Sequence, residues 1–363
     1  MKKNKNYVDL KDQPVPEGQH LLEVDDLKMY FHTEDGVVRA VDGVSYTLDR
    51  GETLGVVGES GSGKSVTAMT IMGLISMPPG KIEGGDVRYR GRSILEMTEE
   101  EMQHIRGNDI AMIFQDPMTS LNPVYKIGKQ VGEGLRLHRG YSKQEALKRA
   151  TELLDLVGIP EPEKRVNEYP HQFSGGMRQR VMIAMALACD PDILIADEPT
   201  TALDVTIQAQ IIELMQEMQE KNGNAIIMIT HDLGVVADMA DKIMVMYAGR
   251  PVEFGTAEEI FYESRHPYTR GLIRSIPEQA IDEKKPLTPI HGNPPSLMNL
   301  PEGCVFSPRC PYATDKCRKQ RPERVVTESG HYSACHYSGD PEFLKNAPET
   351  SRTRKDSKKG GEA

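Results

Sequence analysis

The segment Gly58–Ser65 contains three glycines and ends in lysine and serine. It reads Gly-Glu-Ser-Gly-Ser-Gly-Lys-Ser, which fits the pattern G-x-x-x-x-G-K-[ST], and it lies between an apolar run and an apolar helical pattern. Glycines allow backbone N–H groups to converge on phosphate oxygens, and the start of the following helix adds a positive dipole end. The segment therefore predicts a nucleoside triphosphate site formed by Gly58, Ser60, Gly61, Ser62, Gly63, Lys64 and Ser65.

A pair of acids, Asp197 and Glu198, ends the apolar run 193–196. Acids at the carboxyl end of a buried strand face the ligand crevice of an open α/β sheet. In that crevice we expect Asp197 and the Ser65 hydroxyl to bind Mg²⁺, while Lys64 contacts the β- and γ-phosphates. Glu198 is placed to polarise a water molecule for attack on the γ-phosphate. Acids also end strands without such a role, so it is the upstream phosphate loop that favours the catalytic interpretation.

A Ser-Gly-Gly turn, Ser174-Gly175-Gly176, opens another helical pattern farther along the chain. The start of a helix binds anions through its free backbone N–H groups, so this turn is a second anion-binding end. One nucleotide needs only one phosphate loop. The surplus makes physical sense if the turn serves the nucleotide of a neighbouring subunit.

With these motifs the sequence closely resembles the nucleotide-binding domains of ABC transporters, whose signature motif is LSGGQ. The chain has Phe173 in place of Leu and Met177 in place of Gln, while Ser174, Gly175 and Gly176 are intact. The resemblance covers residues 21 to about 265. It implies an α/β fold, the three-layer P-loop NTPase form of the ABC nucleotide-binding domain, with two ATP molecules bound between head-to-tail subunits.

The remaining motifs of the family occur in the family's order, and their roles are implied by the resemblance. Gln115 matches the Q-loop, which contacts Mg²⁺ or the attacking water and couples to the membrane subunit. Asp204 matches the D-loop at the dimer interface, and His231 matches the switch histidine that contacts the γ-phosphate. Phe31 is the expected aromatic that stacks on adenine, with Tyr30 as the alternative, because strand alternation alone cannot choose between them. Taken singly, each residue could equally be structural.

The sequence after about residue 265 resembles the C-terminal extension of oligopeptide and dipeptide importer ATPases. The resemblance rests on Arg265–Thr269, Pro289–Pro295 and Gly303–Pro311. It implies a heterodimer with a sister ATPase, two transmembrane permease subunits and an extracytoplasmic peptide-binding protein. The implied function is to power oligopeptide import by ATP hydrolysis.

A group of four cysteines follows, at Cys304, Cys310, Cys317 and Cys335. Four thiolates suit either a tetrahedral zinc ion or an iron–sulfur cluster. Structural zinc usually pairs cysteines two to four residues apart, and these cysteines are spaced more widely, which favours iron–sulfur. The family resemblance also implies a [4Fe-4S] cluster. Zinc, or thiols without metal that are free or paired, remain the alternatives.

The elements that must position these residues alternate between strand and helix. Runs rich in Val, Ile, Met and Leu predict strands covered on both faces of a parallel sheet, at Thr53–Val57, Ile110–Phe114, Ile193–Ala196, Ala225–Thr230 and Lys242–Tyr247. An apolar stripe at helical spacing predicts a core-facing helix with Ile207, Ile211, Leu214, Met215 and Met218. This alternation predicts a three-layer α/β fold.

Changes in composition predict how the chain is divided. We expect a flexible segment at residues 1–20, the nucleotide-binding domain at 21–265, and an extension with little regular structure at 266–340. Helical patterns such as Lys143–Val157, without a strong strand beside them, predict a helical subdomain at about 116–190. Residues 341–363 predict a disordered tail.

Charge and hydropathy exclude several classes of function. A net charge of −10 argues against a general nucleic-acid binder. No apolar run of about 18 residues and no secretory signal are present, so we expect a peripheral protein at the cytoplasmic face of the cell membrane, held by its permeases. Three other kinds of ABC ATPase have features that this sequence does not show. Exporters often have fused membrane spans, DNA-repair ATPases have a long coiled coil within the domain, and ribosomal ATPases usually carry two cassettes in one chain. A sister importer for dipeptides, nickel, glutathione or a sugar remains open, because the sequence does not select the cargo.

Overall fold

The computed structural model describes residues 10–11, 13–116, 120–200, 204–275, 290–340 and 342. Its larger sheet has eight strands in the order β11-β12-β10-β9-β3-β8-β7-β6. The strands from β9 to β6 in this order are parallel to one another. They confirm the predicted apolar strands and span Lys242–Tyr247 (β9), Thr53–Val57 (β3), Ala225–Thr230 (β8), Ile193–Asp197 (β7) and Ile110–Ile113 (β6).

Alternate side chains of the parallel strands enter different cores. Along β7, Ile195 belongs to one hydrophobic cluster and Ala196 to another. The first cluster includes residues of α1 (Lys64–Ile71), and the second includes residues of α9 (Val205–Asn222). Helices therefore cover both faces of the sheet, which confirms the predicted three-layer α/β fold.

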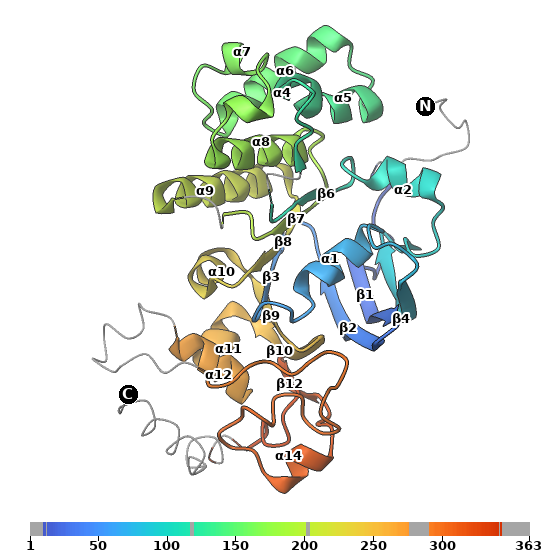
Figure 1. Cartoon of the computed structure of the whole chain (residues 1–363), viewed down its shortest axis with the longest axis vertical. Coiled ribbons are helices and arrows are strands. Elements are labelled where there is room, and N and C mark those ends of the chain that lie inside the picture. The colour runs from blue at the N-terminus through green and yellow to red at the C-terminus, as the bar shows by residue number, and fades with distance from the viewer. Residues whose placement is uncertain are drawn as a thin grey trace.

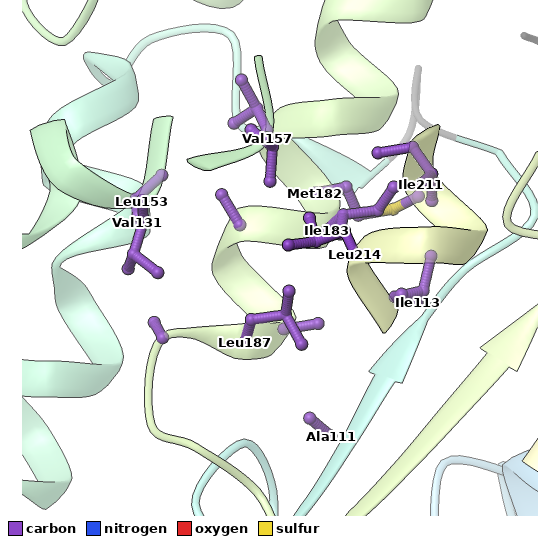
Figure 2. Packing of buried hydrophobic residues seen from close by; sticks show 14 of the residues in the cluster. Ala111, Ile113, Val131, Leu153, Val157, Met182, Ile183, Leu187, Ile211 and Leu214 are labelled. Atoms are coloured by element: carbon purple, nitrogen blue, oxygen red, sulfur yellow. The ribbon is translucent and has the colours of Figure 1, made fainter. Parts of the chain in front are cut away.

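The helix α9 buries its predicted apolar stripe against α8 (Gly175–Leu187). Figure 2 shows Ile211 and Leu214 of α9 beside Met182 and Ile183 of α8, and Ile113 of β6 belongs to the same cluster. The whole stripe lies in or against this core: Ile207, Ile211, Leu214, Met215 and Met218. The core interpretation of the stripe is therefore confirmed.

A second sheet, which is antiparallel and absent from the sequence predictions, has the strand order β2-β1-β4-β5. Its strands span Leu22–Thr33 (β1), Gly36–Leu48 (β2), Gly80–Tyr89 (β4) and Arg92–Ser93 (β5). One face of this sheet joins the cluster that contains α1, while many of the residues between these buried positions are exposed or half-buried. Figure 1 shows the sheet in blue to blue-green beside α1.

A group of helices follows β6 and precedes β7, and it forms the upper part of the molecule in Figure 1. It contains α4 (Ile127–Val131), α5 (Glu133–His138), α6 (Lys143–Leu156), α7 (Pro162–Arg165), the short 3-10 turn Pro170–Gln172 and α8. The Ser142 side chain accepts a hydrogen bond from the Glu145 backbone, and Glu145 accepts one from the Ser142 backbone. This capping box explains why α6 begins at the predicted residue. The domain bounds drawn from the sequence remain predictions.

The C-terminal part adds an antiparallel edge to the larger sheet. It contains β10 (Arg250–Thr256), α11 (Ala257–Tyr262), α12 (Pro267–Arg274), α14 (Asp315–Lys319), β11 (Val325–Val326) and β12 (Tyr332–Ser333). The helix α12 lies directly after residue 265, at the start of the extension that was expected to have little regular structure. Pro267 occupies the first helical position, where its fixed φ angle is favourable, and His266 Nδ1 caps the helix by accepting from the Tyr268 N–H.

Two further short helices complete the described elements, α2 (Glu99–Ile105) and α10 (Leu233–Met239). The predicted flexible segment at residues 1–20 is described only in part. The predicted tail at 341–363 lies outside the described residues apart from residue 342. None of the helices in the described part of the chain is long and apolar enough to cross a membrane.

Candidate functional site

The segment Gly58–Ser65 forms a tight loop between β3 and α1. Gly58 and Gly63 adopt positive φ angles of 149° and 100°. A Cβ atom would lie 2.2 Å from the Met246 carbonyl oxygen at Gly58, and 2.3 Å from the Ala40 carbonyl oxygen at Gly63. Both positions therefore require glycine, because the loop packs directly against the backbone of Met246 on β9 and of Ala40 on β2.

Inside this loop, the Ser62 hydroxyl is buried and has no hydrogen-bond partner among the described residues. Buried polar groups are nearly always paired in folded proteins, so an orphan of this kind calls for an explanation. A phosphate oxygen would supply the missing partner. The loop therefore fits the phosphate group that the sequence predicts for it.

Lys64 begins α1 and places its ammonium group within the loop. The residue is 6% exposed, and Nζ donates hydrogen bonds to the carbonyl oxygens of Gly58 at 2.7 Å and Glu59 at 3.1 Å. Burial lowers the pKa of Lys64, while the carboxylates of Glu198, Asp197 and Glu59 act to raise it. The cation therefore lies among the backbone groups that are predicted to bind phosphate.

Ser65 and Asp197 meet across the end of the sheet. The Ser65 hydroxyl donates a hydrogen bond of 3.0 Å to Asp197 Oδ1, and the Asp197 residue is only 3% exposed. Burial raises the pKa of Asp197, with the nearby Glu198 carboxylate acting in the same direction. A half-buried hydroxyl beside a buried carboxylate supplies oxygen donors of the kind that Mg²⁺ prefers.

Glu198 meets the other two residues predicted to take part in hydrolysis. The Gln115 amide Nε2 donates a hydrogen bond of 3.0 Å to Glu198 Oε2. His231 Nδ1 lies 3.4 Å from Glu198 Oε1 and belongs to a largely exposed side chain. Glu198 itself has a positive φ angle of 48°, which is unusual outside glycine and often occurs at functional sites. The structure thus brings Gln115, Glu198 and His231 together beside the pair formed by Ser65 and Asp197.

The Ser-Gly-Gly turn is placed elsewhere in the chain's fold. Ser174 is the N-cap of α8, its Oγ accepts a hydrogen bond from the Met177 N–H, and both Ser174 and Gly175 are exposed. Figure 1 shows α8 in the upper helical group, whereas α1 lies beside the smaller sheet. Asp204 caps α9 by accepting from the Ile207 N–H, and residues 201–203 of its motif lie outside the described residues. The signature and D-loop roles therefore stay predictions.

The four C-terminal cysteines line one buried cavity of about 20 Å³, with His266 and Phe306 in its wall. All four thiols are free, and burial raises the pKa of Cys310 and of Cys335 to about 12. The sequence spacing alone did not establish this convergence. As the side chains are placed, the described residues contain no set of three His, Cys, Asp or Glu that could hold one metal ion. Four thiols are donors that suit a metal ion or a cluster. As the side chains are placed, however, they do not lie close enough together to hold one.

Comparison with known proteins decides the family. Residues 41–201 match the family model described as ABC transporter, and residues 252–317 match "Oligopeptide/dipeptide transporter, C-terminal region". The chain is 58% identical to the oligopeptide transport ATP-binding protein OppD of Bacillus subtilis (strain 168), over 86% of this chain and 87% of that one. It is 52% identical to the dipeptide transport ATP-binding protein DppD of Escherichia coli (strain K12), over 88% and 97%. The chain belongs to the ABC ATPases of the oligopeptide/dipeptide transporter family.

Solved structures of ABC ATPases share this fold. The dimeric post-hydrolysis state of the ATP-binding cassette MJ0796, bound to ADP and Pi, has a TM-score of 0.60 and 29% identity, and it covers 65% of this chain and 98% of its own. CbiO1 from Clostridium perfringens, part of the transporter complex cbiONQ, has a TM-score of 0.58 and 27% identity, covering 74% and 100%. The P-loop NTPase fold and the ATPase activity predicted from the sequence are thereby confirmed.

The two aromatic candidates for adenine stacking differ in their surroundings in this ABC ATPase. The Tyr30 hydroxyl donates a hydrogen bond of 2.9 Å to Asp42 Oδ1. Burial, together with the bonded carboxylate, raises the pKa of Tyr30 to about 12. Phe31 packs, half-buried, against the core that contains α1 and has no polar group to anchor. The arrangement favours Phe31 as the aromatic that is available for stacking.

Two charged residues of the ABC ATPase site carry no role in the sequence predictions. Glu59 occupies a variable position of the phosphate loop, and its carboxylate is held by Arg309 from the C-terminal extension. The motif pattern accepts any residue at position 59, so it gives no signal for this contact. Arg309 precedes Cys310 in a segment that carries the family resemblance, yet only the structure shows where its guanidinium group lies.

Proposed function

We propose that this ABC ATPase powers the import of oligopeptides at the cytoplasmic face of the cell membrane. The observation that carries the catalytic part is the convergence of Gln115 and His231 on Glu198, next to the Ser65–Asp197 pair. The transport part is supported by the match to the oligopeptide/dipeptide C-terminal region and by relatives named for oligopeptide transport. Import of dipeptides is the alternative within the same family, since DppD proteins are also close relatives.

Hydrolysis follows from the positions of these side chains. The backbone N–H groups of Gly58–Ser65 and the Lys64 ammonium bind the β- and γ-phosphates and neutralise charge on them. Glu198 accepts a proton from a water molecule as the water oxygen attacks the γ-phosphorus and the bond to ADP breaks. His231 contacts the γ-phosphate. Gln115 orients the attacking water or the Glu198 carboxylate, to which it donates a hydrogen bond. Phe31 stacks on the adenine ring.

Magnesium would be held by Ser65 and Asp197, with Gln115 as a further oxygen donor. When bound, it neutralises charge on the β- and γ-phosphate oxygens. The 3.0 Å contact between Ser65 Oγ and Asp197 Oδ1 supports this assignment, because both oxygens already lie together. The buried carboxylate of Asp197 gains a favourable partner in a cation.

The second half of each site is proposed to come from a sister ATPase subunit. Ser174, Gly175 and Gly176 are exposed or half-exposed at the start of α8, where their N–H groups can bind the γ-phosphate of a nucleotide on the sister chain. Asp204 lies at the same interface. ATP binding closes this heterodimer, hydrolysis reopens it, and the helices α4–α8 transmit the motion to two transmembrane permease subunits. An extracytoplasmic peptide-binding protein delivers the cargo.

The transport proposal is tested in vesicles that contain the complete complex with its binding protein. We expect ATP-dependent uptake of peptides of several residues, and stimulation of ATP hydrolysis when the loaded binding protein is added. Uptake of dipeptides, nickel or glutathione instead, with oligopeptides inert, would contradict the assigned cargo. A native complex isolated from the membrane with this chain but without any integral membrane subunits would contradict the importer assignment as a whole.

A [4Fe-4S] cluster bound by Cys304, Cys310, Cys317 and Cys335 is a separate proposal. It is supported by the four thiols around one buried cavity, and their side chains would have to approach one another to bind it. A cluster there would act as a structural clamp, because the described residues that line the cavity include no group suited to a redox substrate. Its ligands would be deprotonated by the bound iron, although burial alone raises the pKa of Cys310.

The cluster is tested by purifying the full chain without oxygen. We expect brown protein with broad visible absorbance, about four iron atoms per chain, and loss of both in a Cys310→Ser variant. A Cys189→Ser variant is the matched control, since that thiol is buried in a different core. Colourless protein free of iron, or stoichiometric zinc, would contradict the proposal.

A further inference from the structure

Arg309 joins the C-terminal extension to the phosphate loop. Its guanidinium group contacts both carboxylate oxygens of Glu59, with Nη1 at 2.5 Å from Oε2 and Nη2 at 2.8 Å from Oε1. The pair is bidentate, the strongest arrangement of this kind. The Arg309 side chain is 5% exposed and that of Glu59 is 27% exposed, so water screens the contact only weakly.

The extension holds the loop at a second point next to this pair. The backbone N–H of Glu59 donates a hydrogen bond of 2.9 Å to the Tyr268 hydroxyl of α12. Glu59 is thus fixed through both its main chain and its side chain. The Glu59 carbonyl oxygen in turn accepts from Lys64 Nζ at 3.1 Å. One residue therefore connects the extension to the lysine that is predicted to bind phosphate.

Arg309 is itself held rigidly by the extension. Its Nε donates to the His291 carbonyl oxygen at 3.0 Å, and its Nη1 also contacts the Tyr247 hydroxyl at 3.2 Å. Beneath it, the rings of Tyr247, Tyr268 and Phe306 pack together, with centroids 4.6 to 5.3 Å apart. A guanidinium group with this many fixed partners cannot follow a moving loop, so it determines where Glu59 lies.

We propose that Arg309 is a positioning residue of the ATPase, which holds Glu59 and neutralises its carboxylate beside the triphosphate. The physical reason is charge. A carboxylate in a loop that binds a polyanion repels it, and a bidentate arginine removes most of that repulsion while fixing the adjacent backbone N–H groups. The proposal rests on the phosphate-binding role of Gly58–Ser65 given under the proposed function, and it adds the extension as a part of the nucleotide site.

A double-mutant experiment on the full chain separates this role from a general effect on folding. We expect Arg309→Met to weaken ATP binding about tenfold, the effect of one lost charge-assisted hydrogen bond. In the assembled transporter, KM for ATP rises by a similar factor and kcat changes less than about threefold, because Arg309 touches none of Gln115, Glu198 and His231. Adding Glu59→Gln to Arg309→Met removes the unpaired carboxylate and recovers most of the lost affinity.

The control is Arg318→Met, which removes an exposed arginine from the same extension, where it forms an ion pair with Asp315 on its own helix. This control should bind ATP like the unaltered chain. If Arg309→Met binds ATP as well as the control does, the proposal is wrong. If the double variant binds as weakly as Arg309→Met, the neutralising role is wrong.

If Arg309→Met does not fold, the proposal is tested by ATP binding of the double variant and of Arg309→Lys. The double variant should then fold and bind ATP within about threefold of Glu59→Gln, since no carboxylate is left unpaired. Arg309→Lys, which keeps the charge, should bind more tightly than the methionine variant. If Lys64→Ala loses ATP binding while every Arg309 variant binds ATP normally, the phosphate loop keeps its assigned role. Only the role of Arg309 is then wrong.

Discussion

Replacing Glu198 by Gln lowers ATP turnover about 10²- to 10⁴-fold, while ATP binding is unchanged, if Glu198 is the general base. Glutamine has the same size and can still accept the hydrogen bond that Gln115 donates at 3.0 Å. The contacts of Lys64 and the Ser65–Asp197 pair are not altered. What is lost is the ability to accept a proton from the attacking water. The measurement is single-turnover hydrolysis together with equilibrium ATP binding.

The matched control for this variant is Glu220→Gln, which changes an exposed glutamate on α9. Its turnover should equal that of the unaltered protein. Single-turnover hydrolysis by Glu198→Gln at the unaltered rate would refute the assigned base. Loss of ATP binding in the same variant would instead show that the carboxylate holds the nucleotide or its metal.

Replacing Lys64 by Ala weakens ATP binding about 10²- to 10⁴-fold, the second large effect that the structure predicts. A lysine that contacts two phosphate groups makes two charge-assisted hydrogen bonds, each worth about 1.5–3 kcal/mol. The ammonium group also ties the loop together, through hydrogen bonds to the carbonyl oxygens of Gly58 and Glu59. Its removal therefore loosens the loop as well as deleting a cation.

Lys81→Ala is the control, because that lysine is exposed on β4 and forms its ion pair with Glu83, away from the phosphate loop. Thermal unfolding of both variants shows whether the fold is retained. Affinity of the Lys64 variant within about threefold of the control, with both proteins folded, would contradict the assigned phosphate contact.

The parallel sheet and its loop could be predicted because their signals are local. Buried strands such as β7 are continuous apolar runs, and the loop pattern is a fixed spacing of glycine, lysine and serine. The antiparallel sheet escaped prediction because one face of β1 and β4 is solvated, and because register shifts near Asp26 and Tyr30 interrupt their alternation. The helix α12 was missed because Pro267 was interpreted only as a loop signal, although it begins a helix.

Motifs could predict which residues belong to the candidate site, but they could not predict the contacts between residues that are far apart in the sequence. The pairing of Gln115 with Glu198 joins residues 83 positions apart. Family resemblance indicated Gln115, whereas Glu198 was indicated by its place at the end of an apolar strand. Arg309 and Glu59 are 250 positions apart, and no sequence motif specifies a contact between them. The contact between Arg309 and Glu59 depends on how the C-terminal extension, which includes α12, packs on β9 through the core that contains Tyr247 and Phe306. That packing is a tertiary property that no local pattern encodes.

The most direct test of the account is a structure of the Glu198→Gln chain with its sister ATPase and ATP. We expect the triphosphate within hydrogen-bond reach of the Gly58–Ser65 backbone and Lys64, with the sister subunit's Ser-Gly-Gly turn closing over the γ-phosphate. Ser174 of this chain should close over the other nucleotide in the same way. A nucleotide bound away from Gly58–Ser65, or a loop left empty at saturating ATP, would contradict the central claim.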